Sequence, residues 1–195
     1  MSLNLPDAGA VLVREGPCYL QAFDRLYAPR ICGWVADDAE LFWLAPKTFP
    51  PLTASKVVAW PGVDGMPCLF MRDGADGPLG YLEVNPMPLE PGHLWLGHCL
   101  LDPDHRGIGL GRRMVRLALQ LAFERRRASR MSLVVFPENT AAVRCYRRVG
   151  FADVRDQVKY FHTTGRRHVM LEMTIDRAAF AGGPDRLDAA GRPGV

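Results

Sequence analysis

The feature that most constrains the fold is a glycine-rich loop, Arg106 to Gly111, which lies between an apolar run and a helical pattern. The run before it, Leu94 to Leu101, is almost continuously apolar, which is typical of a strand buried on both faces. After the loop, apolar residues recur every three or four positions, and this spacing predicts a long helix from about Gly109 to Arg127. A second apolar run, Met131 to Phe136, is typical of another buried strand. The order strand, helix, strand therefore predicts a βαβ unit.

Shorter elements of the same two kinds surround this unit. Further strands are expected at Cys18 to Phe23, Leu69 to Arg72, Leu79 to Val84, Phe151 to Val154 and His168 to Ile175. Two short helices are expected in the stretch that follows Phe23 and runs through Trp34 to Leu44, one after Thr53, and one from Asn139 or Thr140 to Gly150. Together these elements predict an α/β fold with a mixed, twisted sheet of about six or seven strands and flanking helices.

Length and composition favour one domain. A chain of 195 residues with 48% hydrophobic and 23% charged residues can bury one sizeable core and is ordinary for a globular protein. Residues 1–16 lack a strong periodicity and residues 179–195 are rich in glycine and proline, so both segments are expected to be loosely ordered tails. The domain is therefore expected to span residues 17–178.

The charge and cysteine patterns exclude several classes of function. Lys and Arg total 24 against 21 Asp and Glu, and this formal charge of +3 is too small to indicate a nucleic-acid partner. The five cysteines are odd in number and include no CxxC pair, which argues against a disulfide framework and favours a reducing cytoplasm. Neither cysteines nor histidines have metal-ligand spacing, so no metal is expected. The start resembles no signal sequence and no apolar run approaches the ~20 residues of a bilayer span, so no membrane association is expected.

The glycine-rich loop has the chemistry of an anion site. Where a strand gives way to a helix, backbone N–H groups and the positive end of the helix dipole converge on one point. Glycines let a phosphate approach the backbone, and Arg106 and Arg112 can add positive charge at the rim. The glycines run as GxGxG, so neither the GxxxxGK[ST] loop nor the GxGxxG dinucleotide fingerprint is present. A diphosphate is therefore the expected ligand.

The residues around the loop resemble one enzyme family. The segment Asp102 to Gly107 leads into the loop, and the pattern N-x-x-A-x-x-x-Y-x-x-x-G-F follows from Asn139 to Phe151. Over about residues 79–155 the sequence strongly resembles the GNAT superfamily of N-acetyltransferases. The resemblance implies the GNAT acyl-CoA acyltransferase fold and acetyl-CoA as the cofactor. It also implies an acyltransferase that moves the acetyl group to a primary amine by direct attack in a ternary complex.

The resemblance further implies roles for single residues. Main-chain groups of the strand before the loop would hold the pantetheine arm, the loop would hold the pyrophosphate, and Asn139 would bond the pantetheine or nearby main chain. Tyr146 would be the general acid that protonates the departing thiolate, because a phenol keeps its proton at neutral pH. From the residues alone, Tyr146 can also be a packing aromatic side chain and Asn139 a helix N-cap. The implied cofactor-binding residues are Cys99, Leu100, Leu101, Arg106, Gly107, Ile108, Gly109, Leu110, Gly111, Arg112, Asn139 and Tyr146.

The general base that must deprotonate the acceptor amine is less clear from the sequence. In related enzymes the base often lies on the strand Leu94 to Leu101, at positions whose side chains point to the same face as Leu101. In this chain these positions are Trp95 and Gly97, and neither residue is a base. The side chain of His98 is expected on the opposite face of the strand, packed toward the helices, unless a bulge shifts the register. Glu83, in an otherwise apolar run, is either a buried carboxylate with a raised pKa or an exposed partner of Lys or Arg. Both His98 and Glu83 are candidate catalytic residues.

The acceptor is left open by the resemblance. A small-molecule amine and a protein N-terminus both fit the family, and so does a homodimer. The aromatic side chains of Trp34, Phe42, Trp43 and Phe49 can line an acceptor pocket, although their spacing is more typical of core. The missing base on the usual strand supports an alternative, a non-catalytic CoA-binding sensor or structural module. We rank it below catalysis because binding alone gives no use to Tyr146.

Overall fold

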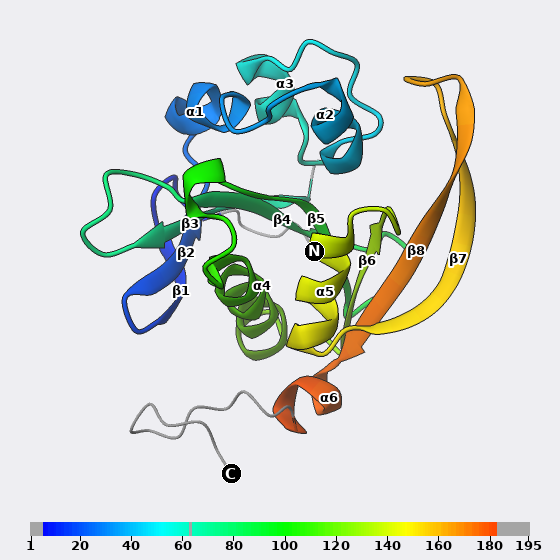
Figure 1. Ribbon diagram of the computed structural model, residues 1–195. Helices are drawn as coiled ribbons and strands as arrows, with labels where there is room; N and C mark the ends of the chain where they lie inside the picture. The colour runs from blue at the N-terminus through cyan, green and yellow to red at the C-terminus, as the bar shows by residue number, and fades with distance from the viewer. Residues whose placement is uncertain (1–5, 63, 183–195) are drawn as a thin grey trace.

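The computed structural model describes residues 6–62 and 64–182 (Figure 1). These residues form one sheet of eight strands in the order β1-β2-β3-β4-β5-β6-β8-β7. β5 and β6 pair in parallel and the other neighbours pair antiparallel, so the sheet is mixed, as predicted. The strands are β1 (Val11–Glu15), β2 (Cys18–Ala22), β3 (Met66–Arg72), β4 (Gly80–Pro86), β5 (His93–Leu101), β6 (Arg130–Val135), β7 (Ala152–Phe161) and β8 (Arg166–Asp176).

Helices cover both faces of the sheet (Figure 1). Three short helices, α1 to α3, lie on one face, and α4 and α5 lie on the other. The helices are α1 (Ala28–Cys32), α2 (Asp38–Leu44), α3 (Ala54–Ala59), α4 (Leu110–Gln120), α5 (Thr140–Val149) and α6 (Arg177–Gly182), with the 3-10 turns η1 (Arg25–Tyr27) and η2 (Pro103–His105) and the π-helical turn η3 (Leu121–Arg125). Within the described residues, no helix has the length and apolar character that crossing a bilayer requires.

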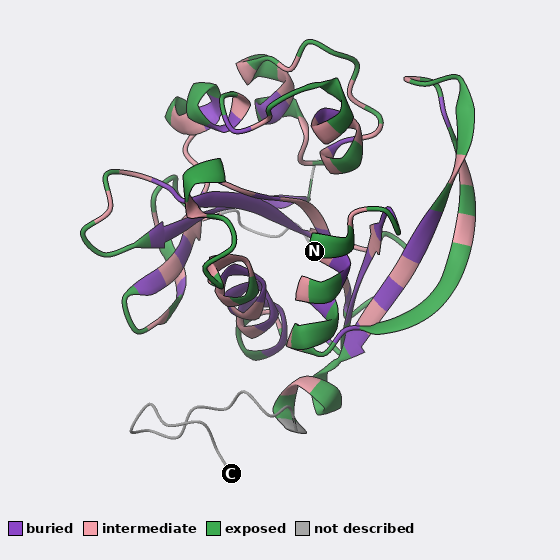
Figure 2. Ribbon diagram, viewed as in Figure 1, coloured by how far each residue is buried: buried purple, intermediate pink, exposed green. Residues whose placement is uncertain are grey.

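Apolar side chains fill the space between these layers (Figure 2). The larger cluster lies under α4 and α5, where Leu117 and Ala118 are fully buried because they share one face of α4. A second cluster packs α1 and α3 on the opposite face around Trp34 and Tyr81. Removal of this apolar area from water is the main favourable contribution to folding. The central strands β4 and β5 are thus covered on both faces, which the apolar sequence of β5 predicts.

All the strands and helices predicted from the sequence are present, and most bounds differ by a few residues. The exception is β7, which was expected to end at Val154 and extends to Phe161. The eighth strand, β1, lies in the segment 1–16 that was expected to be a loose tail. It pairs with β2 across a turn at Gly16, whose φ is +57°. Five residues show too few alternations to distinguish a strand from a loop. At the other end, residues 177–182 form α6, beyond the expected boundary at 178. The tail expectations for residues 1–5 and 183–195 lie outside the described residues.

Helices α4 and α5 both begin at a defined cap, and the cap of α5 is one that the sequence predicts. Gly109 caps α4 in the left-handed region with a φ of +87°. Asn139 caps α5, because its Oδ1 accepts a hydrogen bond from Ala142 N at 3.2 Å. Gly150 ends α5 with a φ of +107°, as expected of a C′ glycine. The predicted long helix is α-helical only to the end of α4, where the π-helical turn η3 takes over.

Strands β7 and β8 form a long, curved hairpin that rises past α2 (Figure 1). The ring of Phe42 on α2 packs against Phe136 and Phe161, with centroid distances of 4.9 and 5.5 Å. At the tip, Thr163 Oγ1 donates a hydrogen bond to the carbonyl oxygen of Pro46 at 2.6 Å. These contacts join the hairpin to the segment between α2 and α3.

Candidate active site

Strands β5 and β6 separate part-way along their length. They pair only where His93–Trp95 runs beside Arg130–Ser132. Beyond that point β5 keeps β4 on one side, while no described strand pairs with its other side. This edge offers backbone N–H and C=O groups to an extended ligand, in the manner of an added strand. The residues predicted to hold pantetheine lie on this stretch of β5: Cys99, Leu100 and Leu101.

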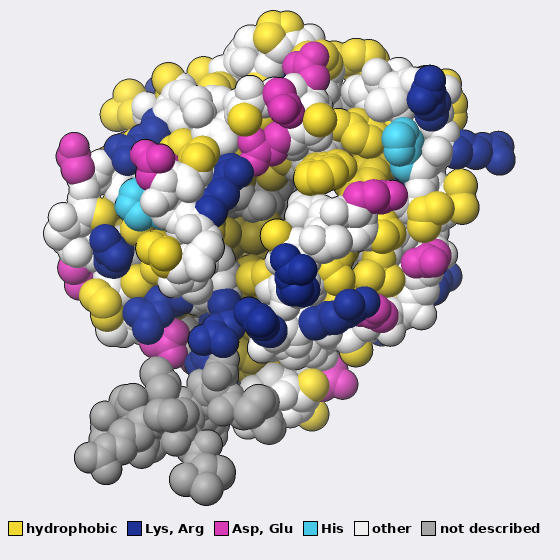
Figure 3. Space-filling view, in the orientation of Figure 1, with side chains coloured by type: hydrophobic (Ala, Val, Ile, Leu, Met, Phe, Trp, Pro, Cys, Tyr) yellow, Lys and Arg dark blue, Asp and Glu magenta, His cyan; other side chains and the backbone are white. Residues whose placement is uncertain are grey.

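The molecular surface is hollowed beside this region, between α4 and α5 and below α2 in the view of Figure 3. Apolar side chains line the hollow and Lys and Arg side chains stand around its rim. An opening of this kind suits a ligand with an apolar arm and phosphate groups.

A β-bulge in β5 determines which way its side chains point. Tyr81 pairs with Leu100 but Glu83 pairs with Gly97, so β5 has one residue more than β4 in this interval. His98 lies in the bulge with a φ of +41°, and its ring meets Glu83 on the face that carries α1 to α3. The sequence places His98 toward the helices unless a bulge shifts the register. This bulge does so, because the extra residue reverses the alternation of side chains.

Residues after the bulge change direction as well. Cys99 and Leu101 pack into the cluster under α4 and α5, whereas Leu100 packs with α1 and α3. Leu101 therefore does not share the facing of Trp95, as an uninterrupted strand would require. The lack of a base at the position of Trp95 carries no weight against catalysis, since His98 reaches the same face.

Glu83 on β4 is the centre of a hydrogen-bonded cluster, and it is only 1% exposed. Its Oε1 accepts from the Tyr81 hydroxyl at 2.8 Å and lies 2.9 Å from His98 Nδ1. Its Oε2 accepts from Asn85 Nδ2 at 3.0 Å. The His98 ring stacks on Trp60, with 4.6 Å between centroids and 12° between planes. The two candidate bases are thus in direct contact and held by their neighbours.

The surroundings of Glu83 favour its ionised form. Burial raises the pKa of this carboxyl, but the hydrogen bond and charge of His98 and the hydrogen bonds from Asn85 and Tyr81 together outweigh burial. The pKa of Glu83 therefore lies below its ordinary value of 4.5. The expectation of a buried carboxylate is confirmed, and the expectation of a raised pKa is wrong because three hydrogen-bond partners stabilise the charge.

Tyr146 stands on α5, on the other face of the sheet from Glu83. Its ring packs edge-on against Phe151 with 5.9 Å between centroids, and its hydroxyl interacts with the thiol of Cys99 on β5. Tyr146 is therefore beside the unpaired part of β5. Burial and the neighbouring thiols of Cys99 and Cys145 raise the pKa of Tyr146 well above its ordinary value of 10. The phenol keeps its proton at neutral pH and remains a hydrogen-bond donor.

The glycine-rich loop connects β5, through η2, to α4. Gly107 and Gly109 have φ values of +78° and +87°, which residues with a side chain rarely adopt. A Cβ at either position would meet nothing within 4 Å, so the space over the loop is open. Gly111 already lies in α4, where a Cβ would come 3.3 Å from Cδ1 of Leu101. The loop thus leaves room for an anion at the first turn of α4, where N–H groups lack helical partners.

The guanidinium of Arg106 bonds to the protein itself. It donates to the carbonyl oxygen of Leu101 from Nε at 3.1 Å and from Nη2 at 3.0 Å. Nη2 also donates to the carbonyl oxygen of Trp34 at 3.1 Å, and Nη1 to Oε1 of Glu40 on α2 at 2.6 Å. Arg106 is therefore a bridge between the end of β5 and the α1–α2 segment. That its charge also acts at the rim of the loop stays a prediction.

Comparison with protein families decides the assignment of the fold. The family model described as "Acetyltransferase (GNAT) family" matches residues 11–151. The chain belongs to this family. The GNAT chain is also similar to the spermine/spermidine N(1)-acetyltransferase of Bacillus subtilis (strain 168), at 35% identity over 60 residues. That alignment covers 31% of this chain and 40% of the curated relative, less than half of the relative's length.

Two solved GNAT structures share the architecture. A probable acetyltransferase of the GNAT family from Chromobacterium violaceum ATCC 12472 superposes with a TM-score of 0.74 at 18% identity, covering 93% of this chain and 96% of that chain. The spermidine N-acetyltransferase from Vibrio cholerae in complex with CoA and spermine gives a TM-score of 0.71 at 17% identity, covering 86% of this chain and 100% of that chain. The predicted GNAT fold is confirmed, with eight strands where six or seven were expected.

We expect Arg106→Met to lower the free energy of unfolding of this GNAT domain by about 1–3 kcal/mol, because it removes hydrogen bonds made by a charged group. Urea denaturation would measure the change. Arg14→Met is the matched control: it removes the exposed ion pair with Asp73 and should cost less than about 1 kcal/mol. An Arg106→Met protein as stable as the wild type would contradict the bridging role.

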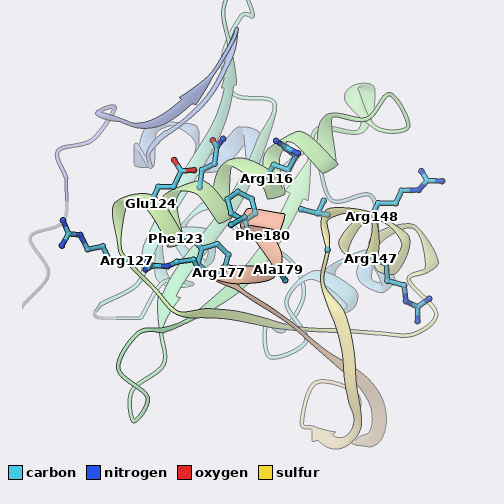
Figure 4. A pocket seen from close by; sticks show the side chains of 13 residues that line it. Arg116, Phe123, Glu124, Arg127, Arg147, Arg148, Arg177, Ala179 and Phe180 are labelled. Atoms are coloured by element: carbon cyan, nitrogen blue, oxygen red, sulfur yellow. The ribbon is translucent and has the colours of Figure 1, made fainter. Parts of the chain in front are cut away.

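A separate cavity of about 650 Å³ lies at the opposite end of α4 and α5, next to α6 (Figure 4). Its lining includes Phe123, Phe180 and arginines from three helical segments. The side chains of Arg127, Arg147 and Arg148 point away from one another, so they do not converge on one ligand (Figure 4). None of the site residues described above lines this cavity. It is therefore distinct from the candidate active site.

Three neighbours of the Glu83–His98 pair were not predicted from the sequence. Tyr81 and Asn85 alternate with Glu83 along β4, and strand periodicity alone would have placed all three on one face. Trp60 follows α3 at its C-terminal end, and no sequence signal connects it with His98. The polar alternation on β4 was therefore detectable, whereas the stacking partner was not.

Proposed function

We propose that this GNAT chain is an acetyl-CoA-dependent N-acetyltransferase that moves an acetyl group to a primary amine by direct attack in a ternary complex. The observation that supports it most is the split between β5 and β6, which has the Glu83–His98 pair on one side and Tyr146 on the other. Transfer from a thioester to an amine needs a proton acceptor and a proton donor in this arrangement. The names of the Bacillus subtilis and Vibrio cholerae relatives, both N-acetyltransferases acting on spermidine, support an amine acceptor.

The residues present fit acetyl-CoA in three places. The open, left-handed glycines Gly107 and Gly109 give a pyrophosphate access to the first turn of α4. The unpaired edge of β5 offers main-chain groups to the pantetheine arm. Asn139 caps α5 through Oδ1, and its Nδ2 can donate to the arm or to nearby main chain. When bound, acetyl-CoA supplies the activated acetyl thioester.

His98 is proposed as the general base, with Glu83 as the residue that positions it. In the tautomer whose Nδ1–H donates to the ionised Glu83, the lone pair lies on Nε2 and can take the proton of the acceptor ammonium. The carboxylate then stabilises the imidazolium that forms. Glu83 is less suited to act as the base itself, because Tyr81 and Asn85 also donate to it and its pKa is lowered.

Tyr146 is proposed as the acid that protonates the departing thiolate. Its raised pKa keeps the phenolic proton in place until a strong base, the thiolate, appears beside it. Cys99 lies next to Tyr146, but burial raises the pKa of its thiol to about 12, so it is not activated as a nucleophile. Direct transfer to the amine, without an acetylated cysteine, follows from this.

The alternative of a non-catalytic CoA-binding module is not favoured. Binding alone gives no role to a His98 ring held by the buried Glu83 carboxylate beside the split. A cytoplasmic location is also proposed, supported by five free cysteines, since cysteines remain unpaired in a reducing compartment. A homodimer stays a prediction from the sequence.

We expect Gly109→Asp to abolish the stabilisation of the domain by coenzyme A, because its carboxylate would occupy the position of the pyrophosphate. At 100 times its dissociation constant a ligand adds ~2.7 kcal/mol to the free energy of unfolding, which is measurable as a rise in Tm. Gly74→Asp, in the turn between β3 and β4, is the matched control. Gly74 has a φ of +76° and open space around it, so the substitution introduces the same backbone strain far from the loop. A wild-type Tm shift in Gly109→Asp would show that the loop does not bind the pyrophosphate.

A further inference from the structure

We infer that the acceptor of this GNAT enzyme is an amine that also carries a carboxylate, and that Lys159, with Lys47 beside it, binds this carboxylate. The acceptor side is the face of the sheet that carries His98 and Glu83, and Lys159 lies at one end of it. The inference rests on the proposed function and names its substrate class. It assigns a specificity role to a hairpin residue far in sequence from the GxGxG loop.

Lys159 stands over the same face of the sheet as the proposed base. On that face Asn85 donates to Glu83 at 3.0 Å, and Trp95 on β5 is the register partner of Asn85. The Nζ atom of Lys159 lies 6.0 Å from the centre of the Trp95 ring. A continuous row of side chains therefore runs from Glu83 through Asn85 and Trp95 to Lys159.

The curvature of the β7–β8 hairpin brings Lys159 to this position, although β6 and β8 separate β7 from β5 in the sheet. The hairpin tip is tied to the α2–α3 segment by the Thr163 hydroxyl, which donates to Pro46 O at 2.6 Å. Lys47 follows Pro46 directly. The charge of Lys47 acts on Lys159, so two lysines from distant parts of the chain lie near each other at this end of the sheet face.

The positive charge at this end is only partly neutralised. Burial, Lys47 and Arg155 lower the pKa of Lys159, while Glu172 raises it. Glu172 is already engaged, because it accepts hydrogen bonds from Arg155 at 2.8 Å and from Gln157. In the described part of the chain, no carboxylate forms an ion pair with Lys47 or Lys159. An arriving carboxylate would therefore lower the electrostatic free energy of this region.

The same charges disfavour a polycation. Spermidine and spermine carry several ammonium groups, and the second ammonium group of either would lie near Lys159 rather than near a carboxylate.

The distance between the proposed base and Lys159 also determines the length of the acceptor that fits. Glu83 and Asn85 are two residues apart along β4, which spans about 7 Å, and Lys159 lies beyond them. An amine and a carboxylate joined by a chain of several carbons should therefore fit better than glycine.

Steady-state acetylation with acetyl-CoA and four probes tests this: 6-aminohexanoate, its neutral amide 6-aminohexanamide, glycine and spermidine. For the wild type we expect kcat/KM to be highest with 6-aminohexanoate. Lys159→Met should lower kcat/KM for 6-aminohexanoate roughly ten- to a hundred-fold, mainly through KM, and leave the value for the neutral amide nearly unchanged. Lys159→Arg should retain most of the wild-type value. Arg167→Met is the matched control, because it removes a positive charge from the opposite face of the same hairpin.

The outcomes separate the inference from the function on which it rests. Equal losses in Lys159→Met for 6-aminohexanoate and its amide would overturn the inference, since the effect would not depend on the carboxylate. A wild-type preference for spermidine would overturn it as well and leave the N-acetyltransferase in place. If coenzyme A binds but none of the four amines is acetylated, the inference fails, because 6-aminohexanoate is among them. Failure of the wild type to bind coenzyme A would instead overturn the proposed function.

Discussion

Replacing Tyr146 with phenylalanine will lower the rate of acetyl transfer by roughly 10²–10⁴-fold, while coenzyme A binding stays close to that of the wild type. The substitution removes one hydroxyl and keeps the ring that packs on Phe151. Because burial raises the pKa of Tyr146, the hydroxyl acts in this site as a proton donor and not as a charge that the cofactor needs for binding. A thiol-release assay would measure turnover, and isothermal titration would measure coenzyme A affinity.

Tyr160→Phe is the matched control for Tyr146→Phe. Tyr160 lies on β7 and is 53% exposed, so loss of its hydroxyl should change neither turnover nor fold. If Tyr146→Phe shows undiminished turnover under conditions where chemistry limits the rate, Tyr146 has no part in proton transfer and is a residue of the core.

His98→Gln is expected to cause a loss of the same order, 10²–10⁴-fold, because it removes the proposed base. Glu83→Gln should cause a smaller loss, since the imidazole remains but loses the carboxylate that positions it and stabilises its charge. Tyr81→Phe is the matched control, because it removes one hydrogen bond to Glu83 without touching the contact with His98. Should Glu83→Gln abolish turnover while His98→Gln retains it, Glu83 would be the base.

Stability against pH gives a second readout for Glu83. Its pKa is lower in the folded protein than its ordinary value of 4.5, so the ionised form stabilises the fold. This contribution is fully present above the unfolded pKa and is lost as the pH falls through the folded pKa. Glu83→Gln should therefore flatten the decline in Tm that the wild type shows below about pH 4.5. An unchanged acid decline would mean that Glu83 is not preferentially ionised in the fold.

Much of the cofactor side could be predicted because its signals are local. The glycine-rich loop, the helix that follows it and the Asn139 cap each depend on residues within a few positions of one another. The role of the β5 edge in holding pantetheine came from the family resemblance and not from a local signal. Tyr146 was identified as a site residue because the surrounding motif resembles that of the family. In the structure it lies beside the unpaired edge of β5.

The acceptor side could not be predicted to the same depth because it depends on pairing between distant segments. The bulge at His98 exists only in the register of β5 against β4, and a sequence pattern along β5 alone gives the opposite facing. The position of Lys159 depends on the curvature of a hairpin, which no local periodicity describes. Trp60 reaches His98 from a helix that precedes it by almost forty residues in sequence, a contact that only the packed structure reveals.

The contact between Thr163 and Pro46 joins the β7–β8 hairpin to the segment between α2 and α3, and these two segments are here called the wall of the proposed acceptor side. The residues proposed to bind coenzyme A come from elsewhere, in one continuous stretch from β5 to α5. Mutations in the wall can therefore accumulate over generations without disturbing the cofactor. An ancestor could exchange one amine for another through small changes in the hairpin, and each intermediate would still hold acetyl-CoA and remain exposed to selection as a working enzyme.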